Sequence, residues 1–340
     1  MDTKEKCEVF SLQREILPYI SQRLRNILQK TAAGDLTGIE EIRMRSCKPL
    51  ILQGSRGELF IDPEGVPSHS CQNPITANPE DIQKTLELMS ENSIYAYQDE
   101  IKNGYITLKG GHRVGIAGRV VLEGNSIKNI KDVSGLNIRL SRQVKGCAAK
   151  VIKYLLKGSE NVRSTLIISP PQCGKTTLLR DIARILSDGV PALGFKGVKV
   201  GVVDERSEIA ACYKGVPQND LGMRTDVMDG CPKAAGMNLM LRAMSPRVII
   251  TDEIGNSGDK DAVMQVINAG VKIITTAHGF NISEMKTRKE VLELIEQRVF
   301  ERYLVLSGSD GPGTLEEVAD GIAMEVIYKR NRLKGDCNGS

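Results

Sequence analysis

The segment that most constrains the fold of this chain is SPPQCGKTT, at residues 169–177. From Gly174 onward it matches the phosphate-binding loop signature G-x-x-x-x-G-K-[ST], but Ser169 stands where the signature begins with glycine. A working loop of this kind needs a strand before it and a helix after it. The apolar run at 164–169 predicts the strand, and 175–189 has helical spacing and ends at a glycine. Because a chance match would lack this context, we interpret the segment as a phosphate-binding loop.

The loop residues have distinct expected roles. Lys175 is expected to neutralise the phosphate charge of ATP, and Thr176 to give its hydroxyl to Mg²⁺. A serine at position 169 would store about 1–3 kcal/mol of backbone strain if its φ were positive. A loop held by two prolines can instead place it at negative φ. The residues expected to bind the nucleotide here are Ser169, Pro170, Pro171, Gln172, Cys173, Gly174, Lys175, Thr176 and Thr177.

Downstream of the loop, apolar strand patterns alternate with helical patterns, which is typical of a parallel sheet covered by helices. Strands are predicted at 197–205, 247–253, 271–278 and 302–307, and helices at 232–244, 259–270 and 283–300. Polar groups gather where these strands end, and ligands of open parallel sheets bind at that edge. We therefore predict an α/β core with a central, mostly parallel sheet.

The strand predicted at 247–253 ends in the acidic pair Asp252 and Glu253. A strand-end aspartate can join the coordination shell of Mg²⁺, and a neighbouring glutamate can orient or deprotonate the attacking water. A capped strand end would explain one acid but not the pair. We therefore assign Asp252 to the metal and Glu253 to the chemistry.

Other strand ends offer further candidates for the same site. Asp204 and Glu205 close the strand predicted at 197–205, and His278 closes the strand predicted at 271–278. The two acids are expected to face the nucleotide, with ordinary surface acids as the alternative. His278 is expected to sense the γ-phosphate through a hydrogen bond. A strand-end histidine whose hydrogen bonds are satisfied within the protein is the alternative.

The first half of the chain predicts a smaller α+β domain at residues 1–145. The segment 12–30 has a helical pattern, 39–61 predicts short strands around a Gly-rich turn, and 102–127 predicts antiparallel strands punctuated by glycine. A helix is predicted to begin after an Asn78 N-cap, with Pro79 in its first turn. The second domain is expected at 146–330, and the tail at 331–340 is expected to be disordered.

Composition restricts the other classes of protein. Net charge is only +4 and aromatic residues are 4% of the chain, so nucleic acid is an unlikely partner. The eight cysteines form no C-x-x-C pair, and the chain starts without an apolar segment. These features predict a protein of the reducing cytosol. No apolar run reaches the ~18 residues that would span a bilayer.

Several long segments of the sequence resemble one known family, that of the stage III sporulation AA proteins. In the second half these are SPPQCGKTTLLRDIAR, VDERSEIAAC, RTDVMDGCPKAAGMNLMLRAMSPRVIITDEIG and ITTAHG. In the first half they are GGHRVGIAGR and NIRLSRQVKGCA. The resemblance spans almost the whole chain, which makes it far more specific than the loop alone.

That family is similar to the type II and type IV secretion ATPases, which are hexameric rings with an amino-terminal domain packed on a RecA-like core. The resemblance implies that Lys175 and Thr176 form the Walker A pair and that Asp252 and Glu253 form the Walker B pair. It also implies that DERSE stands at an acidic box and TTAHG at a histidine box. The chain departs from the usual GPPGVGKTT of the family at Ser169 and Gln172.

The resemblance predicts an ATPase required for sporulation, with ATP and Mg²⁺ as cofactors. Its expected partners are further copies of itself in a hexameric ring, and membrane proteins of the channel complex between mother cell and forespore. Its expected location is the cytoplasm, at the mother-cell face of the outer forespore membrane. Two alternatives stay open, a RecA-like nucleic-acid-binding ATPase and a nucleotide-gated scaffold with little turnover.

Two arginines before the connector are candidates for completing the active site. Phosphoryl transfer gains from an arginine that reaches the transition state. Arg139 and Arg142 lie just before the predicted boundary, so we expect the amino-terminal domain to carry them to a site between domains or subunits. The alternative is that both are surface charges beside a strand.

Overall fold

The computed structural model describes residues 12–32, 34–70 and 72–330, and the expected disordered tail at 331–340 lies outside them. The chain divides into two compact units, Met1–Arg142 and Gln143–Ser340. No helix of the described residues is long and apolar enough to cross a membrane.

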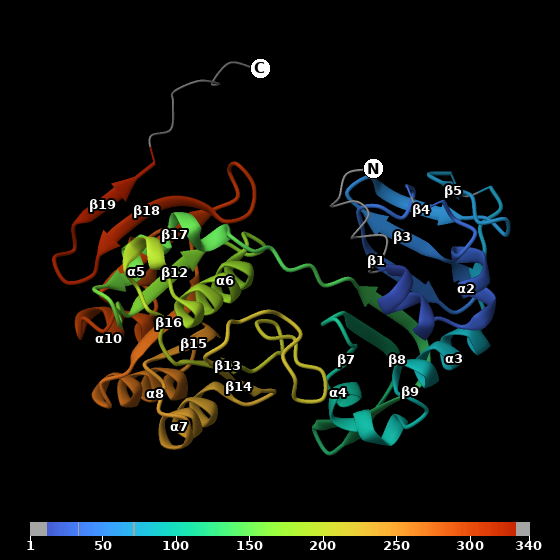
Figure 1. Cartoon of the computed structure of the whole chain (residues 1–340). Coiled ribbons are helices and arrows are strands. Elements are labelled where there is room, and N and C mark those ends of the chain that lie inside the picture. Colours follow the sequence, from blue (N-terminus) through green and yellow to red (C-terminus); the bar gives the residue numbers. More distant parts are fainter. Residues whose placement is uncertain (1–11, 33, 71, 331–340) are drawn as a thin grey trace. The chain divides into compact units, whose positions relative to one another are not determined.

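The first unit is built around an antiparallel sheet with strand order β5-β4-β3-β1-β9-β8-β7 (Figure 1). Its strands are β1 (Ile39–Arg45), β3 (Ile51–Gly54), β4 (Gly57–Ile61), β5 (Pro67–Ser68), β7 (Tyr105–Thr107), β8 (Arg113–Glu123) and β9 (Ser126–Arg139). The short strands β2 (Lys48–Pro49) and β6 (Thr76–Ala77) pair separately. The short strands predicted in 39–61 and the antiparallel strands predicted in 102–127 are both present.

Helices cover this sheet and share one apolar core with it. The prediction for α3 (Pro79–Met89) is confirmed in detail, because the Asn78 side chain accepts from the amide of Asp81 and Pro79 occupies the first turn. Other helical segments of this unit are α2 (Gln22–Leu28), α4 (Gln98–Lys102) and the 3₁₀ turn Ile94–Tyr97.

The single helix predicted at 12–30 is wrong. The chain forms a π turn at Leu12–Ile16, a 3₁₀ turn at Leu17–Tyr19 and then α2. Pro18 has no amide hydrogen to continue a helix, and its ring disfavours helical geometry in the preceding residue. The break lets Ser21 reach α3, where its hydroxyl donates to Asp81 at 2.7 Å.

The second unit contains an eight-stranded sheet with β12 near its centre (Figure 1). In spatial order its strands are β14 (Thr225–Asp229), β13 (Val200–Asp204), β15 (Val248–Glu253), β16 (Lys272–His278), β12 (Thr165–Ser169), β17 (Arg302–Ser307), β18 (Thr314–Asp320) and β19 (Val326–Lys329). The first six are parallel, and β18 and β19 are antiparallel. The predicted α/β core with a mostly parallel sheet is confirmed.

Helices pack on both faces of this sheet, as the alternation along β12 requires. Ile167 joins a core with the buried side of α6 (Lys175–Asp188). Leu166 and Ile168 point the other way and join a core with helices that follow later in the chain. Those helices are α7 (Lys233–Ala243), α8 (Ser257–Asn268), α9 (Ile282–Met285) and α10 (Lys289–Glu296). Smaller elements are α5 (Ile152–Leu155), β10 (Leu156–Lys157), β11 (Asn161–Val162) and the 3₁₀ turns Cys147–Lys150 and Pro191–Leu193.

The helix predicted at 283–300 is wrong as a single element. It divides into α9 and α10, separated at residues 286–288. The Thr287 hydroxyl donates to the Glu284 carbonyl at 2.8 Å, and Arg288 adopts an extended conformation with φ −97° and ψ 115°. A local side-chain bond of this kind competes with helix propagation.

Candidate functional site

The phosphate-binding loop joins the end of β12 to the start of α6. Ser169 is the last residue of β12 and Lys175 is the first residue of α6. Gln172 has φ 60° and Gly174 has φ 78°, whereas Ser169 is not among the residues with positive φ. The departure from glycine at position 169 therefore creates no left-handed strain. The strained backbone is instead at Gln172, the other position where this chain lacks a glycine that is usual in the family it resembles.

The Lys175 ammonium lies back over this loop. Its Nζ donates to the carbonyl oxygens of Ser169 and Pro170, each at 3.1 Å, and lies 2.7 Å from Nδ1 of His278. Partial burial lowers the pKa of Lys175, and the negative charge of Glu253 acts in the opposite direction. The lysine is thus fixed at the mouth of the loop by side-chain and backbone acceptors.

His278 connects the lysine to Glu253. It ends β16 in register with Ser169 on β12, and its Nε2 lies 2.9 Å from Oε2 of Glu253 at the end of β15. The ammonium can only donate, so Nδ1 must accept and the ring proton must sit on Nε2, facing the carboxylate. The side chains of His278 and Glu253 are each 37% exposed, so the connection is open to solvent and to a ligand.

Asp252 lies beside this chain of contacts on β15. Its Oδ1 is buried without a hydrogen bond among the described residues, and Nζ of Lys233 approaches it to 3.4 Å as an ion pair. Burial raises the pKa of Asp252, and the Lys233 charge opposes that effect. A carboxylate at this strand end offers the oxygen ligands that a hard cation prefers.

Mg²⁺ therefore fits the residues present, but it would need ligands beyond the protein. No group of three or more His, Cys, Asp or Glu among the described residues is placed to hold a metal ion. Asp252 and the hydroxyl of Thr176, the second residue of α6, would supply protein oxygens. Nucleotide phosphates and water commonly complete such a shell.

The acidic residues at the end of β13 behave differently from those on β15. Asp204 is fully buried, and its carboxylate accepts from the backbone amides of Glu208, Ile209 and Ala210 at 2.9, 2.8 and 2.7 Å. Burial raises the pKa of Asp204 to about 6. The structure uses this side chain to hold the following loop, and it does not bring it to the Lys175–His278–Glu253 chain. Glu205 instead lies 2.7 Å from Lys233.

Lys233 is the residue of this region that the sequence analysis missed. It is the first residue of α7, its side chain is 10% exposed, and it contacts both Glu205 and Asp252. A cation at a helix N-terminus opposes the helix dipole. Burial alone would lower the pKa of Lys233, but Glu205 and Asp252 raise it. The sequence did offer one signal for Lys233, because this lysine lies in the first turn of a predicted helix that follows the strand-end acids along the chain.

A second missed element covers the phosphate-binding loop. The turn between β17 and β18, at residues 308–313, approaches it closely, and the Gly313 amide donates to the Cys173 carbonyl at 3.0 Å. A Cβ on Gly174 would lie 3.2 Å from the Gly313 nitrogen. Gly174 is therefore required both for its positive φ and for this contact. The Gly-rich sequence GSDGPG was the signal for a turn of this kind.

The predicted arginines lie in the first unit. Arg139 is the exposed last residue of β9, and Arg142 donates from Nη2 to the Ile39 carbonyl at 2.7 Å. The Arg142 contact ties the end of this unit to the start of β1 (Ile39–Arg45). A catalytic role for either arginine stays a prediction.

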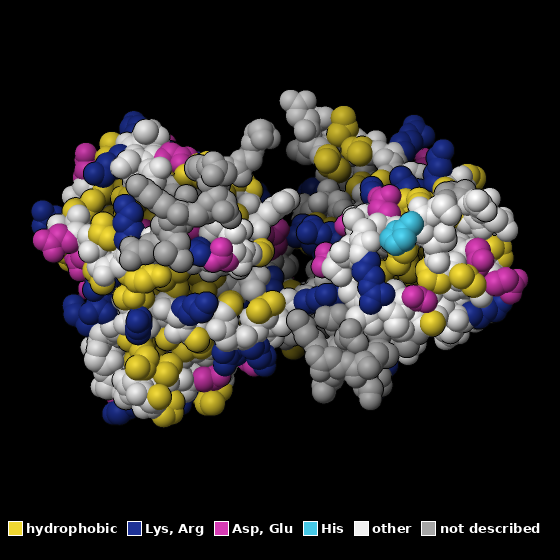
Figure 2. Space-filling view, turned by 90° about the horizontal axis from the view of Figure 1, so that it is seen from above, with side chains coloured by type: hydrophobic (Ala, Val, Ile, Leu, Met, Phe, Trp, Pro, Cys, Tyr) yellow, Lys and Arg dark blue, Asp and Glu magenta, His cyan; other side chains and the backbone are white. Residues whose placement is uncertain are grey.

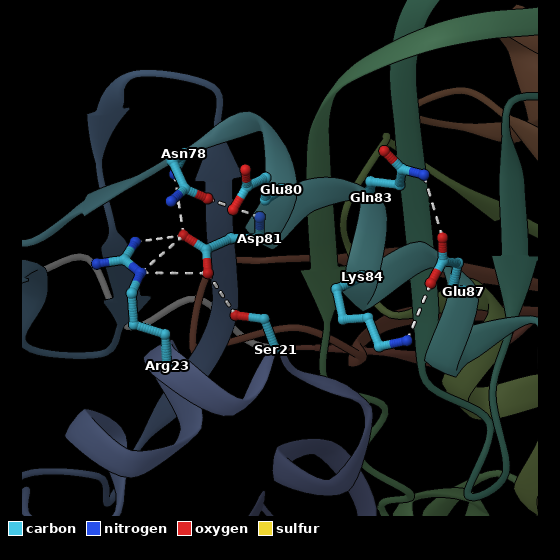
Figure 3. Close-up of a pocket in the computed structure, with 8 residues that line it drawn as sticks. All are labelled: Ser21, Arg23, Asn78, Glu80, Asp81, Gln83, Lys84 and Glu87. Atoms are coloured by element: carbon cyan, nitrogen blue, oxygen red, sulfur yellow. Dashed lines mark hydrogen bonds and ion pairs between the residues drawn. The ribbon is translucent and has the colours of Figure 1, made fainter.

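A polar hollow of about 410 Å³ lies beside the start of α3 in the first unit (Figure 3). Four of its charged groups form two pairs, Arg23 with Asp81, and Lys84 with Glu87 at 3.1 Å. These contacts fix the start of α3, and none of the residues predicted to bind nucleotide lines the hollow. Figure 2 shows basic side chains interspersed with acidic ones on each unit, not a continuous basic stripe.

Comparison with known proteins gives both a family and a fold. The family model described as "Sporulation stage III, protein AA" matches residues 11–326. "Stage III sporulation protein AA" of Bacillus subtilis (strain 168) is 42% identical over 306 residues, which cover 90% of this chain and 94% of that protein. "Protein SEEDLING PLASTID DEVELOPMENT 1" of Arabidopsis thaliana is 33% identical over 165 residues, covering 47% of this chain but only 22% of that protein.

Solved structures of other proteins share the fold. The Legionella pneumophila ATPase DotB aligns with a TM-score of 0.52 at 13% identity, covering 88% of this chain and 79% of that one. The pilus retraction motor PilT with bound ADP aligns with a TM-score of 0.53 at 12% identity, covering 86% and 77%. The predicted similarity to RecA-like secretion ATPases is therefore confirmed at the level of the fold.

Proposed function

Because this chain belongs to the Sporulation stage III, protein AA family, we propose that it is a sporulation ATPase that binds and hydrolyses ATP with Mg²⁺. The observation that carries the proposal is the contact chain from Lys175 through His278 to Glu253. It joins a phosphate-binding lysine to a carboxylate at the carboxyl ends of three adjacent strands. That edge is where open parallel sheets bind their ligands.

Each residue of the site has a task in this mechanism. Lys175 and the amides at the start of α6 bind the phosphates, because a helix N-terminus favours anions. Thr176 and Asp252 would hold Mg²⁺, which supplies positive charge to the phosphate oxygens. Glu253 orients the attacking water and accepts its proton. The turn at 308–313 supports the loop through Cys173.

Assembly and location extend the proposal beyond the single chain. We propose that the protein forms a hexameric ring at the mother-cell face of the outer forespore membrane, where it is coupled to membrane proteins of the channel complex. Membership of the family supports the sporulation role, and the fold shared with DotB and PilT supports a motor-type ATPase. Arg139 and Arg142 would reach the site of a neighbouring subunit.

The direct test is hydrolysis of MgATP by Lys175→Ala. We expect no measurable turnover and an unchanged circular dichroism spectrum, because the ammonium is half-buried at the loop and the fold does not depend on it. Lys196→Ala is the matched control, since the side chain of this lysine is 72% exposed and pairs with Glu160 at 3.0 Å, outside the loop. Wild-type turnover in Lys175→Ala would overturn the assignment of the loop.

A mixing experiment tests the arginines. Glu253→Gln subunits keep both arginines, and an Arg139→Ala/Arg142→Ala protein keeps an intact loop and base. If the arginines act between subunits, mixed rings should regain turnover that neither variant shows alone. Full activity of the double-alanine protein by itself would end the idea.

A further inference from the structure

The hydrogen bonds of Lys175 account for all three protons of its ammonium group. Two go to carbonyl oxygens of the loop, Ser169 and Pro170 at 3.1 Å, and the third goes to Nδ1 of His278 at 2.7 Å. An ammonium has three donors and no acceptor. A phosphate oxygen that accepts a hydrogen bond from Lys175 must therefore replace one of these three acceptors. The histidine is the only side chain among the three.

The backbone of His278 is held while its ring remains accessible. Residue 278 is in register with Ser169 on the neighbouring strand, and the following Gly279 amide donates to the Ser169 carbonyl at 3.2 Å. The ring itself is 37% exposed. Motion at this position is therefore rotation of a side chain, which needs no change in the sheet.

The second ring nitrogen carries the contact to the base. With Nδ1 accepting from the lysine, the ring proton lies on Nε2, which is 2.9 Å from Oε2 of Glu253. As long as this contact persists, one carboxylate oxygen of Glu253 lies beside the ring and not beside a water molecule. Lys175 and Glu253 are therefore linked through one rigid five-membered ring.

We propose that His278 is a positioning residue that latches Lys175 to Glu253 before nucleotide binds. Phosphate binding draws the lysine from Nδ1, the ring loses one of its two anchors, and Glu253 becomes free to turn toward water. Binding and activation of the base are thereby coupled, and the coupling is reciprocal. This inference rests on the proposed ATPase function and adds the order in which the site is assembled.

The latch makes a prediction opposite in sign to that of a direct phosphate contact. A histidine that touches the bound nucleotide strengthens binding, so its loss weakens affinity. A histidine that competes with phosphate for Lys175 weakens binding, so its loss tightens affinity. The sign of the change in affinity decides between the two roles.

The contacts from Lys175 through His278 to Glu253 can first be tested without nucleotide, by ¹⁵N NMR of histidine-labelled full-length protein. The chain has three histidines, and a His278→Gln spectrum identifies the resonances of His278. We expect the tautomer with the proton on Nε2, and a shift of the Nδ1 resonance in Lys175→Ala. The resonances of His112, in the other unit, serve as an internal control. A His278 Nδ1 resonance that is the same with and without Lys175 would overturn the latch.

Calorimetric titration with MgADP and with a magnesium complex of a non-hydrolysable ATP analogue then tests the competition. Glutamine places its amide near the ε-nitrogen, so His278→Gln keeps a donor for Glu253 and loses the lysine contact. We expect about three- to tenfold tighter binding, as for loss of one charged hydrogen bond at a half-exposed site. His278→Asn places an acceptor near the δ-nitrogen and should bind like the wild type. Weaker binding by His278→Gln would overturn the latch in favour of direct contact.

The two proposals fail in different ways. A wild-type protein that binds neither nucleotide would refute the ATPase function, while the nucleotide-free NMR comparison would still judge the hydrogen-bond chain. Normal binding and hydrolysis, with an Nδ1 resonance insensitive to Lys175, would leave the ATPase intact and refute the latch.

Discussion

Two histidines, one in each unit, each accept a hydrogen bond at Nδ1 and place Nε2 beside a glutamate, but in different surroundings. Nδ1 of His112 accepts from the Ser141 amide at 3.1 Å, and its Nε2 lies 3.0 Å from Oε2 of Glu15. Nδ1 of His278 accepts from Lys175, and its Nε2 faces Glu253. The partners on Nδ1 differ in kind, since one is a backbone amide and the other is the tip of a flexible side chain.

Exposure separates the two histidines further. The side chain of His112 is 1% exposed and that of His278 is 37% exposed. A buried ring tied to the backbone fixes the end of the first unit's sheet, whereas an accessible ring between two charged side chains can exchange partners. The pattern of contacts alone therefore does not distinguish these two rings, whereas their exposure and the kind of partner on Nδ1 do.

The largest expected effect separates the two glutamates that face these rings. Glu253→Gln keeps shape and hydrogen bonding but removes the base, so MgATP turnover should fall by about 10²–10⁴. Nucleotide affinity should be retained. Glu15→Gln is the matched control, and its turnover should equal that of the wild type. Equal losses in the two variants, or a collapse of affinity in Glu253→Gln with unchanged turnover per bound ATP, would contradict the comparison.

The sequence alone predicted those features of the second unit that depend on local residue patterns. The five parallel strands predicted from apolar runs are present, because a fully buried strand must be continuously apolar. The residues that meet at their ends, Lys175, Glu253 and His278, followed from strand–loop–helix context and the edge at which parallel strands terminate.

The remaining features depend on contacts between distant segments. Nothing local to Lys233 indicates that it lies between acids of two strands, and nothing local to the turn at 308–313 indicates that it supports Cys173. Of the two positions where this chain lacks the expected glycine, Gln172 is the one with a strained, left-handed backbone, although the signature drew attention to Ser169. The sequence identifies which residues are unusual, but φ values come only from the folded loop.

The next effect concerns stability. His112→Leu removes the acceptor for the part-buried Ser141 amide and should cost the first unit about 1–3 kcal/mol, the usual range when a polar group shielded from water loses its partner. His278→Leu should change the stability of the second unit by less than about 1 kcal/mol, because water can replace its half-exposed partners. Hydrogen exchange of core amides in β9 and β12 reports each unit separately. A larger loss in His278→Leu would reverse the comparison.

The pH dependence of the two units should also differ. Burial lowers the pKa of His112, and the hydrogen bond and charge of Glu15 oppose this only in part. Just below pH 6.5 the unfolded chain therefore binds more protons at this residue than the native protein does, so stability should fall as pH decreases through that range. The slope is at most about 1.4 kcal/mol per pH unit.

Hydrogen exchange of β9 amides between pH 7.5 and 5.5, corrected for intrinsic rates, measures this slope. His112→Leu should flatten it, whereas His278→Leu should leave it unchanged. A wild-type first unit that gains stability on acidification in this range would contradict the buried neutral ring.

The smallest expected effect comes from the backbone conformation of the residues just before His112 in the first unit and just before Lys175 in the second. Before His112 the left-handed positions are glycines, Gly110 with φ 88° and Gly111 with φ 79°, and a Cβ on Gly110 would lie 2.8 Å from the His112 ring. Before Lys175 the left-handed position with φ 60° is Gln172. A non-glycine residue in this region costs about 1–2 kcal/mol. Part of that cost is offset because glycine has more freedom in the unfolded chain.

Gln172→Gly should therefore stabilise the second unit by up to about 1 kcal/mol, measured by denaturant unfolding. Ser169→Gly is the matched comparison at the other departure from the loop signature. Because Ser169 is a buried strand residue outside the positive-φ set, glycine there should destabilise by about 0.5–1 kcal/mol. If the two variants change stability in opposite directions, the backbone at Ser169 accommodates serine without strain, whereas the loop keeps Gln172 although the backbone there is strained. A loss of stability in Gln172→Gly would instead mean that the glutamine side chain makes contacts worth more than the strain of its backbone.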